Sequence, residues 1–198
     1  MPRPRLIVVA GPPAAGKSTS APLLAHALGM PWFSTDAIKE RLADAIGFDA
    51  LAYADALGTA ALLEVIAIAR ELLTSGNDVM IEGYIPHGSN EALLLPLVAI
   101  SDAALLHLRA DDLTLKDRYE NRALQPDRHW IHGDLAKIGT LLPELPAEMA
   151  APLELGISRI FIDTTAGLTR LDETIVLVNI ALREPAPHDY RLDIPMPT

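Results

Sequence analysis

The chain has 198 residues, half of them hydrophobic, and a formal net charge of −10 at pH 7. This length suits one domain with a substantial core. The acidic balance disfavours a nucleic-acid partner, since such proteins usually have basic surfaces. The lack of cysteine excludes a disulfide scaffold, a thiolate nucleophile and a Cys-ligated zinc site.

The apolar run Leu6–Ala10 is too short for a secretory signal or a membrane span. The longest apolar stretch with helical spacing, residues 60–73, carries Glu64, Arg70 and Glu71, which is typical of a core helix. We therefore expect a cytoplasmic protein.

Short apolar runs alternate with longer segments of helical periodicity along the chain. Strands are predicted at Leu6–Ala10, Pro31–Ser34, Asp78–Ile81, Ala103–Leu108 and Arg159–Ile162. Helices are predicted at Lys17–Leu28, Asp36–Ile46, Leu51–Leu73, Ser89–Ile100 with an interruption at Pro96, Leu113–Leu124 and Thr169–Arg183. This alternation predicts an α/β fold in which helices cover both faces of a five-stranded parallel sheet.

Residues 125–155 break the pattern, because they contain four prolines and show weak periodicity. We interpret a segment of about 122–155 as an inserted lid over the site, the alternative being an ordinary surface connection. The single domain is expected to span residues 1–183, and the proline-rich residues 184–198 are expected to form an extended tail with no assigned function.

The segment GPPAAGKS, residues 11–18, matches G-x-x-x-x-G-K-[ST] at every fixed position, after a predicted strand and before a predicted helix. In such a P-loop (Walker A motif), backbone N–H groups and the helix N-terminus hold the nucleotide phosphates. The lysine reaches the β- and γ-phosphates, and the Ser18 hydroxyl ligates Mg²⁺. The alternative is a structural turn with a chance lysine. The residues expected to bind the nucleotide are Gly11, Ala14, Ala15, Gly16, Lys17, Ser18 and Thr19.

The motif predicts a P-loop NTPase fold, a three-layer α/β/α sandwich, without deciding between a kinase, a GTPase and a motor ATPase. The chain is short for a large ATPase module, and it has no N-K-x-D guanine-specificity motif. A small kinase of nucleoside-kinase-like fold is therefore favoured, with ATP and Mg²⁺ as cofactors.

Asp36 follows the second predicted strand, at the sheet edge where open α/β sheets bind ligands. A kinase that acts on a hydroxyl needs a carboxylate to orient that hydroxyl and accept its proton. The alternative is that Asp36 or Thr35 caps the next helix. Lys39 follows one turn later, where it could pair with substrate or with Asp36.

Five segments occur together along residues 5–180: GPPAAGKST, FSTDAIKERL, VMIEGY, LHLRADD and RYENR, with a later RH. This combination resembles a branch of small AAA-type P-loop kinases that includes zeta-toxin-like kinases, chloramphenicol-phosphotransferase-like enzymes and polynucleotide 5′-kinase domains. The resemblance implies that Asp36 is the general base for an acceptor hydroxyl, and that Lys39 engages the acceptor or a phosphate.

Glu82 ends the third predicted strand, where an acidic residue can hold a Mg²⁺-bound water or bind the acceptor, although relatives more often carry aspartate there. The alternative is a solvated carboxylate at a strand end. Tyr84 and His87 follow on the same rim and are candidate acceptor contacts, as is the region of Tyr53, unless they are simply exposed loop residues.

Arg118 and Arg122 share one face of a predicted helix, and Arg128 follows it. Fixed guanidinium groups can stabilise the charge that spreads over a transferring phosphoryl group. The resemblance implies this role for arginines at the start of the lid. We expect Arg122 and Arg128 to be catalytic together with Lys17, and Arg118 to bind the nucleotide; the alternative is an ion-paired helix surface.

His129, His132 and Asp134 suggest a metal site, but this spacing is common by chance, and a role in the lid is favoured. Thr164 and Thr165 follow the fifth predicted strand, where the resembling kinases line the adenine pocket. Arg109, after the fourth strand, is a weaker candidate.

The sequence favours an ATP- and Mg²⁺-dependent kinase that phosphorylates a hydroxyl of a small molecule, such as an antibiotic, sugar, nucleoside or nucleotide-sugar. The partners are ATP and this acceptor, with nucleic acid and membrane disfavoured. The alternatives are a polynucleotide 5′-hydroxyl kinase, which the acidic charge disfavours, and a regulator that binds ATP without transfer.

Overall fold

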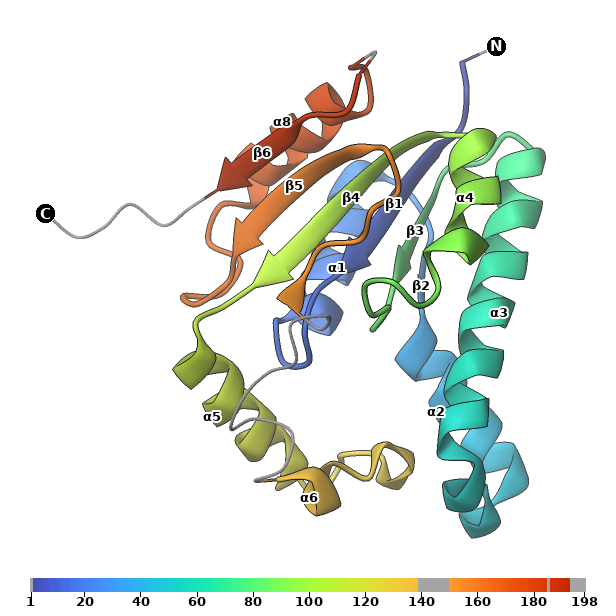
Figure 1. The fold of residues 1–198 in the computed structure, drawn as a ribbon, viewed down its shortest axis with the longest axis vertical. Coiled ribbons are helices and arrows are strands. Elements are labelled where there is room, and N and C mark those ends of the chain that lie inside the picture. Colours follow the sequence, from blue (N-terminus) through green and yellow to red (C-terminus); the bar gives the residue numbers. More distant parts are fainter. Residues whose placement is uncertain (1, 139–149, 185, 193–198) are drawn as a thin grey trace, which may run out of the picture.

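The computed structural model describes residues 2–138, 150–184 and 186–192. A parallel sheet lies at the centre, and helices cover both of its faces (Figure 1). The strands are β1 (Arg5–Ala10), β2 (Trp32–Ser34), β3 (Val79–Glu82), β4 (Asp102–Arg109), β5 (Ser158–Asp163) and β6 (Asp189–Leu192). The sheet order is β2-β3-β1-β4-β5-β6.

Helical segments follow or connect these strands in the described chain. The longer helices are α1 (Lys17–Leu28), α2 (Thr35–Ile46), α3 (Ala54–Thr74), α4 (Glu91–Ala99), α5 (Asp112–Ala123) and α8 (Leu171–Ala181). The shorter segments are the 3₁₀ helices η1 (Phe48–Tyr53) and η2 (Trp130–His132) and the single turn α6 (Asp134–Lys137). The predicted α/β fold is confirmed.

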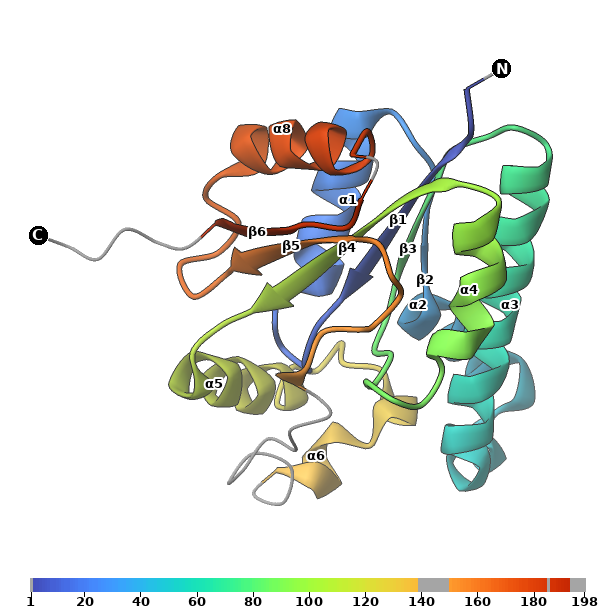
Figure 2. The ribbon, with the colours of Figure 1, turned by 45° about the horizontal axis from the view of Figure 1, so that its top comes forward.

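The sequence of β1 explains why both faces of the sheet are covered. Leu6 and Val8 point to one face and pack with the α3–α4 layer, whereas Ile7 and Val9 point to the other and pack with α1 and α8. All four are fully buried, as expected for a central parallel strand with period-two side chains. Figure 2 shows the two helical layers on opposite sides of the sheet.

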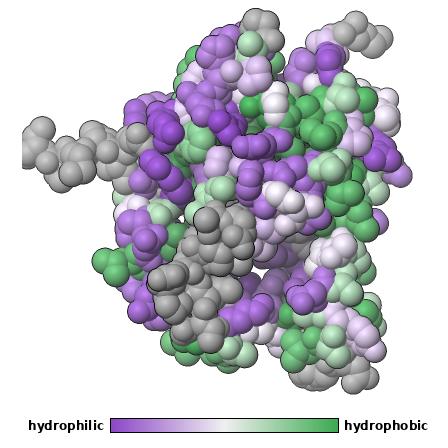
Figure 3. Space-filling model, viewed as in Figure 1, coloured by the Kyte–Doolittle hydropathy of each residue, from purple (hydrophilic) through white to green (hydrophobic). Residues whose placement is uncertain are grey.

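Helix α3 belongs to a stretch, residues 50–74, that is long and apolar enough to span a membrane by composition, with a mean hydropathy of 1.7. One face of α3 packs into the core, and α4 lies beside it. Figure 3 shows apolar side chains gathered over α3 and α4, where Leu63, Leu95 and Ile100 are exposed.

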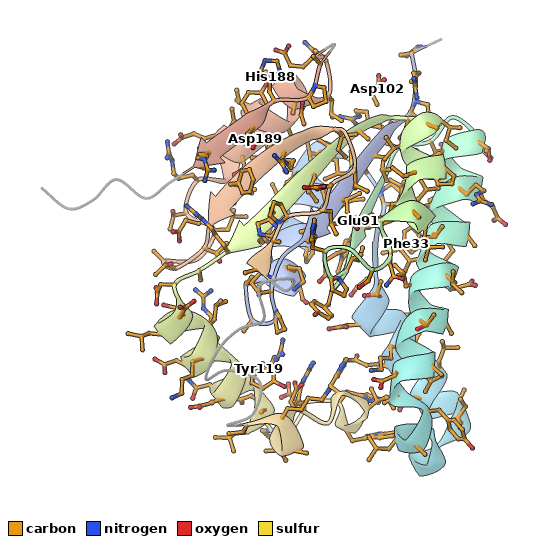
Figure 4. All side chains as sticks on the ribbon, in the orientation of Figure 1. Phe33, Glu91, Asp102, Tyr119, His188 and Asp189 are labelled. Carbon is orange, nitrogen blue, oxygen red and sulfur yellow. The ribbon has the colours of Figure 1, made fainter. Side chains whose placement is uncertain are left out.

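The prediction of five strands was wrong, because part of the expected tail forms β6 beside β5. The side chain of Arg159 on β5 holds Asp189 on β6 through two bonds of 2.7 and 2.9 Å (both strands appear in Figure 4, with Asp189 labelled). The expected interruption at Pro96 was also wrong, since α4 continues through this residue. The rest of the tail, residues 193–198, and most of the central lid, residues 139–149, lie outside the described chain.

All six strands run parallel, so their carboxyl ends meet at one edge of the sheet. The register places the last residue of β2, Ser34, opposite Glu82 at the end of β3, and Arg109 opposite Asp163. The P-loop follows β1 at this edge, which is where open α/β sheets bind their ligands.

Candidate active site

The P-loop joins β1 to α1, and its backbone adopts positive φ angles that favour glycine. Gly16 has φ +81° and caps α1 without a side-chain hydrogen bond, and the first turn of α1 carries no acidic residue. The helix N-terminus therefore keeps backbone N–H groups that no side-chain cap satisfies, together with the positive end of the helix dipole. This arrangement suits a phosphate group.

Gly11 has a structural role in the loop besides its predicted contact with the nucleotide. A Cβ on this residue would lie 2.1 Å from the Leu108 carbonyl oxygen, so the loop can pass β4 only with glycine at this position. Gly11 and Ala15 do not line the cavity beside the loop; Ala15 is fully buried, and its carbonyl oxygen accepts a hydrogen bond of 2.9 Å from the Thr164 hydroxyl. Both residues therefore help to shape the loop, and their contact with the nucleotide stays a prediction.

A cavity of about 760 Å³ opens in front of the P-loop, between α1, α2, α5 and the segment that carries Arg128 and Asp134. Figure 3 shows hydrophilic side chains on the visible surface of this region, beside the grey atoms. The predicted site residues that line the cavity are Ala14, Gly16, Lys17, Ser18, Thr19, Asp36, Lys39, Tyr84, Arg118, Arg122, Arg128 and Thr164. Four predicted site residues lie outside its lining: Gly11, Ala15, Glu82 and His87.

Lys17 is the buried cation of the site, with 8% of its surface exposed. Its ammonium donates hydrogen bonds of 2.9 and 2.8 Å to the carbonyl oxygens of Gly11 and Pro12. Burial lowers the pKa of Lys17, whereas the nearby Glu82 and Asp36 carboxylates raise it and partly offset the effect of burial. The P-loop carbonyl oxygens therefore hold the Lys17 ammonium next to the position where the loop is expected to bind a phosphate.

Glu82 lies behind the cavity, next to the residue expected to bind metal. It is 2% exposed, its Oε1 accepts a hydrogen bond of 3.4 Å from the Ser18 hydroxyl, and no described group bonds its Oε2. Burial raises the pKa of Glu82, while the Ser34 hydroxyl and Lys17 oppose this rise. A buried carboxylate oxygen beside a hydroxyl is a donor set that suits Mg²⁺, and this contact favours the metal role of Glu82 over acceptor binding.

Asp36 lies in the first turn of α2 and lines the cavity. The helix is capped by another residue, since the Ser34 hydroxyl accepts a hydrogen bond of 3.4 Å from the Ala37 backbone N–H. The alternative that Asp36 or Thr35 caps α2 is therefore wrong. The carboxylate of Asp36 lines the same cavity as Lys17 and has no hydrogen bond or ion pair with another residue that the structure describes.

Asp134 holds two of the predicted catalytic arginines. Its Oδ2 accepts a hydrogen bond of 2.7 Å from Arg128 Nε and lies 3.5 Å from Arg122 Nη2. Its Oδ1 accepts a bond of 3.0 Å from the hydroxyl of Tyr119, which α5 presents to α6 (Figure 4). Burial by itself would raise the pKa of Asp134, but the bond to Arg128 and the two guanidinium charges lower it.

Glu40 extends this network to α2. Its Oε1 lies 2.7 Å from His132 Nε2 and 3.9 Å from Arg128 Nη1. Arg128 thus bridges Asp134, in α6, to Glu40, on the helix that carries Asp36. Sequence reasoning missed the contributions of Glu40 and Tyr119, because nothing local indicates that either side chain reaches the lid.

Arg118 and Thr164 meet on the opposite side of the P-loop from α2. The Arg118 guanidinium donates bonds of 2.6 and 3.0 Å to the carbonyl oxygens of Thr164 and Thr165. The Thr164 hydroxyl donates to the Ala15 carbonyl oxygen and also lies 2.9 Å from the Arg109 carbonyl oxygen. These contacts join the segment after β5 to the P-loop.

The chain matches a protein family over residues 6–137, which include the P-loop, Asp36 and the three arginines. That family is described as the AAA domain. The chain belongs to it. No curated protein matched the chain.

The fold is also found among solved structures. A protein from Chloroflexus aurantiacus J-10-fl, provisionally described as a kinase, is 25% identical, with 92% of this chain and 98% of that one covered and a TM-score of 0.75. The APS kinase CysC of Mycobacterium tuberculosis, solved with AMPPNP and APS, is 19% identical, with 93% and 100% covered and a TM-score of 0.58. Kti12 of Chaetomium thermophilum, solved with ADP-AlF3, is 15% identical, with 90% and 100% covered and a TM-score of 0.56.

His87, a candidate acceptor contact, does not line the cavity. Its Nδ1 lies 3.1 Å from the Pro152 carbonyl oxygen and 3.1 Å from Glu91 Oε1. His107, buried in β4, holds the same segment through a contact of 3.1 Å with the Ala150 carbonyl oxygen. The two imidazoles therefore hold the chain at residues 150–152, within the predicted lid.

The suggested metal histidines separate into different contacts. His129 stacks on Trp130 and lies 3.0 Å from Asp44, whereas His132 faces Glu40. The described residues contain no group of three or more His, Asp or Glu side chains able to hold a metal. Tyr53, which was expected near the acceptor, is exposed and does not line the cavity.

Proposed function

We propose that this protein is an ATP- and Mg²⁺-dependent kinase that transfers the γ-phosphate to a hydroxyl of a small molecule. The single observation that carries this proposal is the position of Asp36. Its carboxylate shares one cavity with the P-loop lysine and is not used to cap its helix. A protein that only bound nucleotide would not need a carboxylate there.

Each group has a role in the transfer. Lys17 and the N-terminus of α1 hold the phosphates, while Ser18 and Glu82 would hold Mg²⁺, which neutralises charge on the phosphate oxygens when bound. Asp36 accepts the proton of the acceptor hydroxyl. The hydroxyl oxygen of the acceptor then bonds to the γ-phosphorus, while the bond between that phosphorus and the bridging oxygen of ADP breaks. Arg122 and Arg128 stabilise the charge on the transferring group.

We further propose that the protein belongs to the branch of zeta-toxin-like, chloramphenicol-phosphotransferase-like and polynucleotide-kinase-like enzymes, and that residues 122–155 form its lid. The element from Thr35 to Lys39 supports the branch, since Asp36 and Lys39 both line the cavity. The lid is supported by Arg128 and Asp134, which reach the cavity from that segment.

The test measures label transfer from γ-labelled ATP into a panel of aminoglycosides, other hydroxyl-bearing antibiotics, nucleosides, sugars, nucleotide-sugars and a 5′-hydroxyl oligonucleotide. Asp36→Asn should lower the transfer rate about 10²- to 10⁴-fold with ATP binding intact, because general-base catalysis contributes an effect of this size. Asp172→Asn, an exposed aspartate of α8, is the matched control and should leave transfer unchanged.

Transfer that survives in Asp36→Asn would contradict the assignment of the base. Label only in the oligonucleotide would favour a polynucleotide kinase, despite the acidic charge of the chain. ATP binding without transfer to any compound, together with a protein partner whose affinity depends on nucleotide, would favour a regulator.

A further inference from the structure

The charge of the cavity is opposite to that of the protein. The chain carries a net charge of −10, but six lysine and arginine side chains line the cavity against three carboxylates among the described residues. The cations are Lys17, Lys39, Arg118, Arg122, Arg128 and Lys137, and the carboxylates are Asp36, Glu40 and Asp134. A cleft of one sign attracts ligands of the other.

Two of the three carboxylates are already paired. Asp134 binds Arg128 and Arg122, and Glu40 contacts His132 and Arg128. The excess of positive charge therefore remains after the ion pairs of the lid are formed. The nucleotide phosphates would bind to Lys17, Arg118 and the lid arginines. Lys39 and Lys137 are the two cavity lysines that the nucleotide does not account for.

Lys39 and Lys137 reach the cavity from two separate elements. Lys39 stands one turn after Asp36 on α2 and is half-buried, with no ion pair to any described residue. Lys137 ends α6, and its ammonium donates a hydrogen bond of 2.9 Å to the carbonyl oxygen of His132, which holds it at the cavity. A half-buried ammonium near a second one is costly, and a negative group that binds both removes this cost.

Lys39 and Lys137 line the same cavity as Asp36. Burial lowers the pKa of Lys39 and the positive charge of Lys137 lowers it further, whereas Asp36, Asp55 and Asp134 raise it. Asp36 raises the pKa of Lys39 and also that of Lys17. The candidate base therefore shares the cavity with the P-loop lysine and with Lys39 and Lys137.

We infer that the acceptor is an anion, a hydroxyl compound whose carboxylate or phosphate group is bound by Lys39 and Lys137 while its hydroxyl meets Asp36. This inference rests on the proposed kinase function, because it takes Asp36 as the group that faces the acceptor. It narrows the acceptor from any hydroxyl-bearing compound to hydroxy acids and phosphorylated alcohols of small size. A neutral antibiotic or sugar offers no group of opposite charge to these two ammonium ions.

The test separates anion binding from phosphate transfer. The protein is saturated with Mg²⁺ and AMPPNP, so that the P-loop is occupied, and is titrated by calorimetry at constant ionic strength with inorganic sulfate. Three matched pairs follow: glycerate and glycerol, glucuronate and glucose, ribose 5-phosphate and ribose. The variants are Lys39→Gln with Lys137→Gln, the charge-preserving Lys39→Arg, and Lys116→Gln as a control on exposed α5 surface.

Sulfate is expected to bind the wild type, and its affinity should fall at least tenfold in the double variant while Lys39→Arg and Lys116→Gln retain it. The anionic member of a pair should bind, and accept label from ATP, at least tenfold better than its neutral partner. Unchanged AMPPNP affinity in every variant shows that the P-loop side is folded.

Sulfate that does not bind, or that binds equally well without the two lysines, would overturn the inference. So would label transfer to a neutral compound with no preference for charge, an outcome that leaves the kinase proposal standing. Anion binding that depends on both lysines, without transfer to any compound, would support the anion site and count against the kinase. Preference for the carboxylate pairs or for the phosphate pair identifies the anionic group.

Discussion

Asp134 is expected to set the geometry of the two lid arginines without touching the reacting atoms. In Asp134→Asn, the amide oxygen can still accept the Tyr119 hydrogen bond, but the charge-assisted bond of 2.7 Å to Arg128 is lost or weakened, as is the attraction to Arg122 at 3.5 Å. Hydrogen bonds to charged groups contribute about 1.5–3 kcal/mol in proteins.

If this free energy positions the guanidinium groups for the transition state, its loss appears in the rate. A change of about 1.4 kcal/mol is tenfold, so kcat should fall about 10- to 100-fold in Asp134→Asn. The KM for ATP should change much less, because Lys17 and the helix N-terminus carry most of the ground-state binding. The assay is steady-state transfer from labelled ATP to the acceptor that the panel identifies, with slow hydrolysis of ATP as a readout that needs no acceptor.

Asp127→Asn is the matched control, since Asp127 is exposed in the same segment and should leave kcat unchanged. Circular dichroism and AMPPNP affinity show whether the variant is folded. An unchanged kcat in folded Asp134→Asn would refute the positioning role. A loss confined to ATP affinity would mean that the network supports nucleotide binding instead.

Other changes test the fold and the metal site. Burial lowers the pKa of His107 to about 4, below its ordinary value of 6.5. The folded protein is therefore progressively destabilised as the pH falls from 6.5 toward 4, because the imidazole takes up a proton more readily in the unfolded chain. From pH 7 to pH 5 the free energy of unfolding, measured with denaturant, should fall by about 2 kcal/mol more in the wild type than in His107→Gln. Gly11→Ala should destabilise the protein by about 3 kcal/mol or more, because its Cβ would overlap the Leu108 carbonyl, whereas Gly29→Ala meets no atom within 4 Å and should cost only about 1 kcal/mol; equal costs would contradict the close approach. Ser18→Ala should raise the Mg²⁺ concentration needed for half-maximal activity at least tenfold, and an unchanged Mg²⁺ titration would remove Ser18 from the metal site.

The strands and helices that local signals define were predicted well. Helix α1 has the predicted bounds, because a P-loop glycine starts it and Gly29, with φ +66°, ends it. The buried run of β1 and the helical spacing after it likewise depend on neighbours in the chain. Such signals survive folding because the backbone preferences of glycine and the period of apolar side chains act over a few residues.

Elements whose structure depends on residues far away in the chain were harder to predict from the sequence. The strand β6 has only four residues, lies among prolines and joins the sheet through β5, so nothing within the tail distinguishes it from an extended segment. Pro96 was expected to break α4, yet α4 packs beside α3 and buries Leu94 and Leu97, and this packing accompanies a continuous helix despite the missing N–H of proline.

The residues of the candidate site likewise fall into those that local sequence predicts and those that only the tertiary structure brings together. The P-loop and Asp36 could be read from the chain, because each chemistry needs given residue types at short spacing next to a strand end. Four features could not be predicted: the pairing of Asp134 with two arginines, the link from Glu40 to His132, the contacts of His87 with Pro152 and Glu91, and the presence of Lys39 and Lys137 on one cavity. These contacts join residues from α2, α5 and the lid, whose approach is set by packing against the sheet, and their energies depend on burial that no local pattern records.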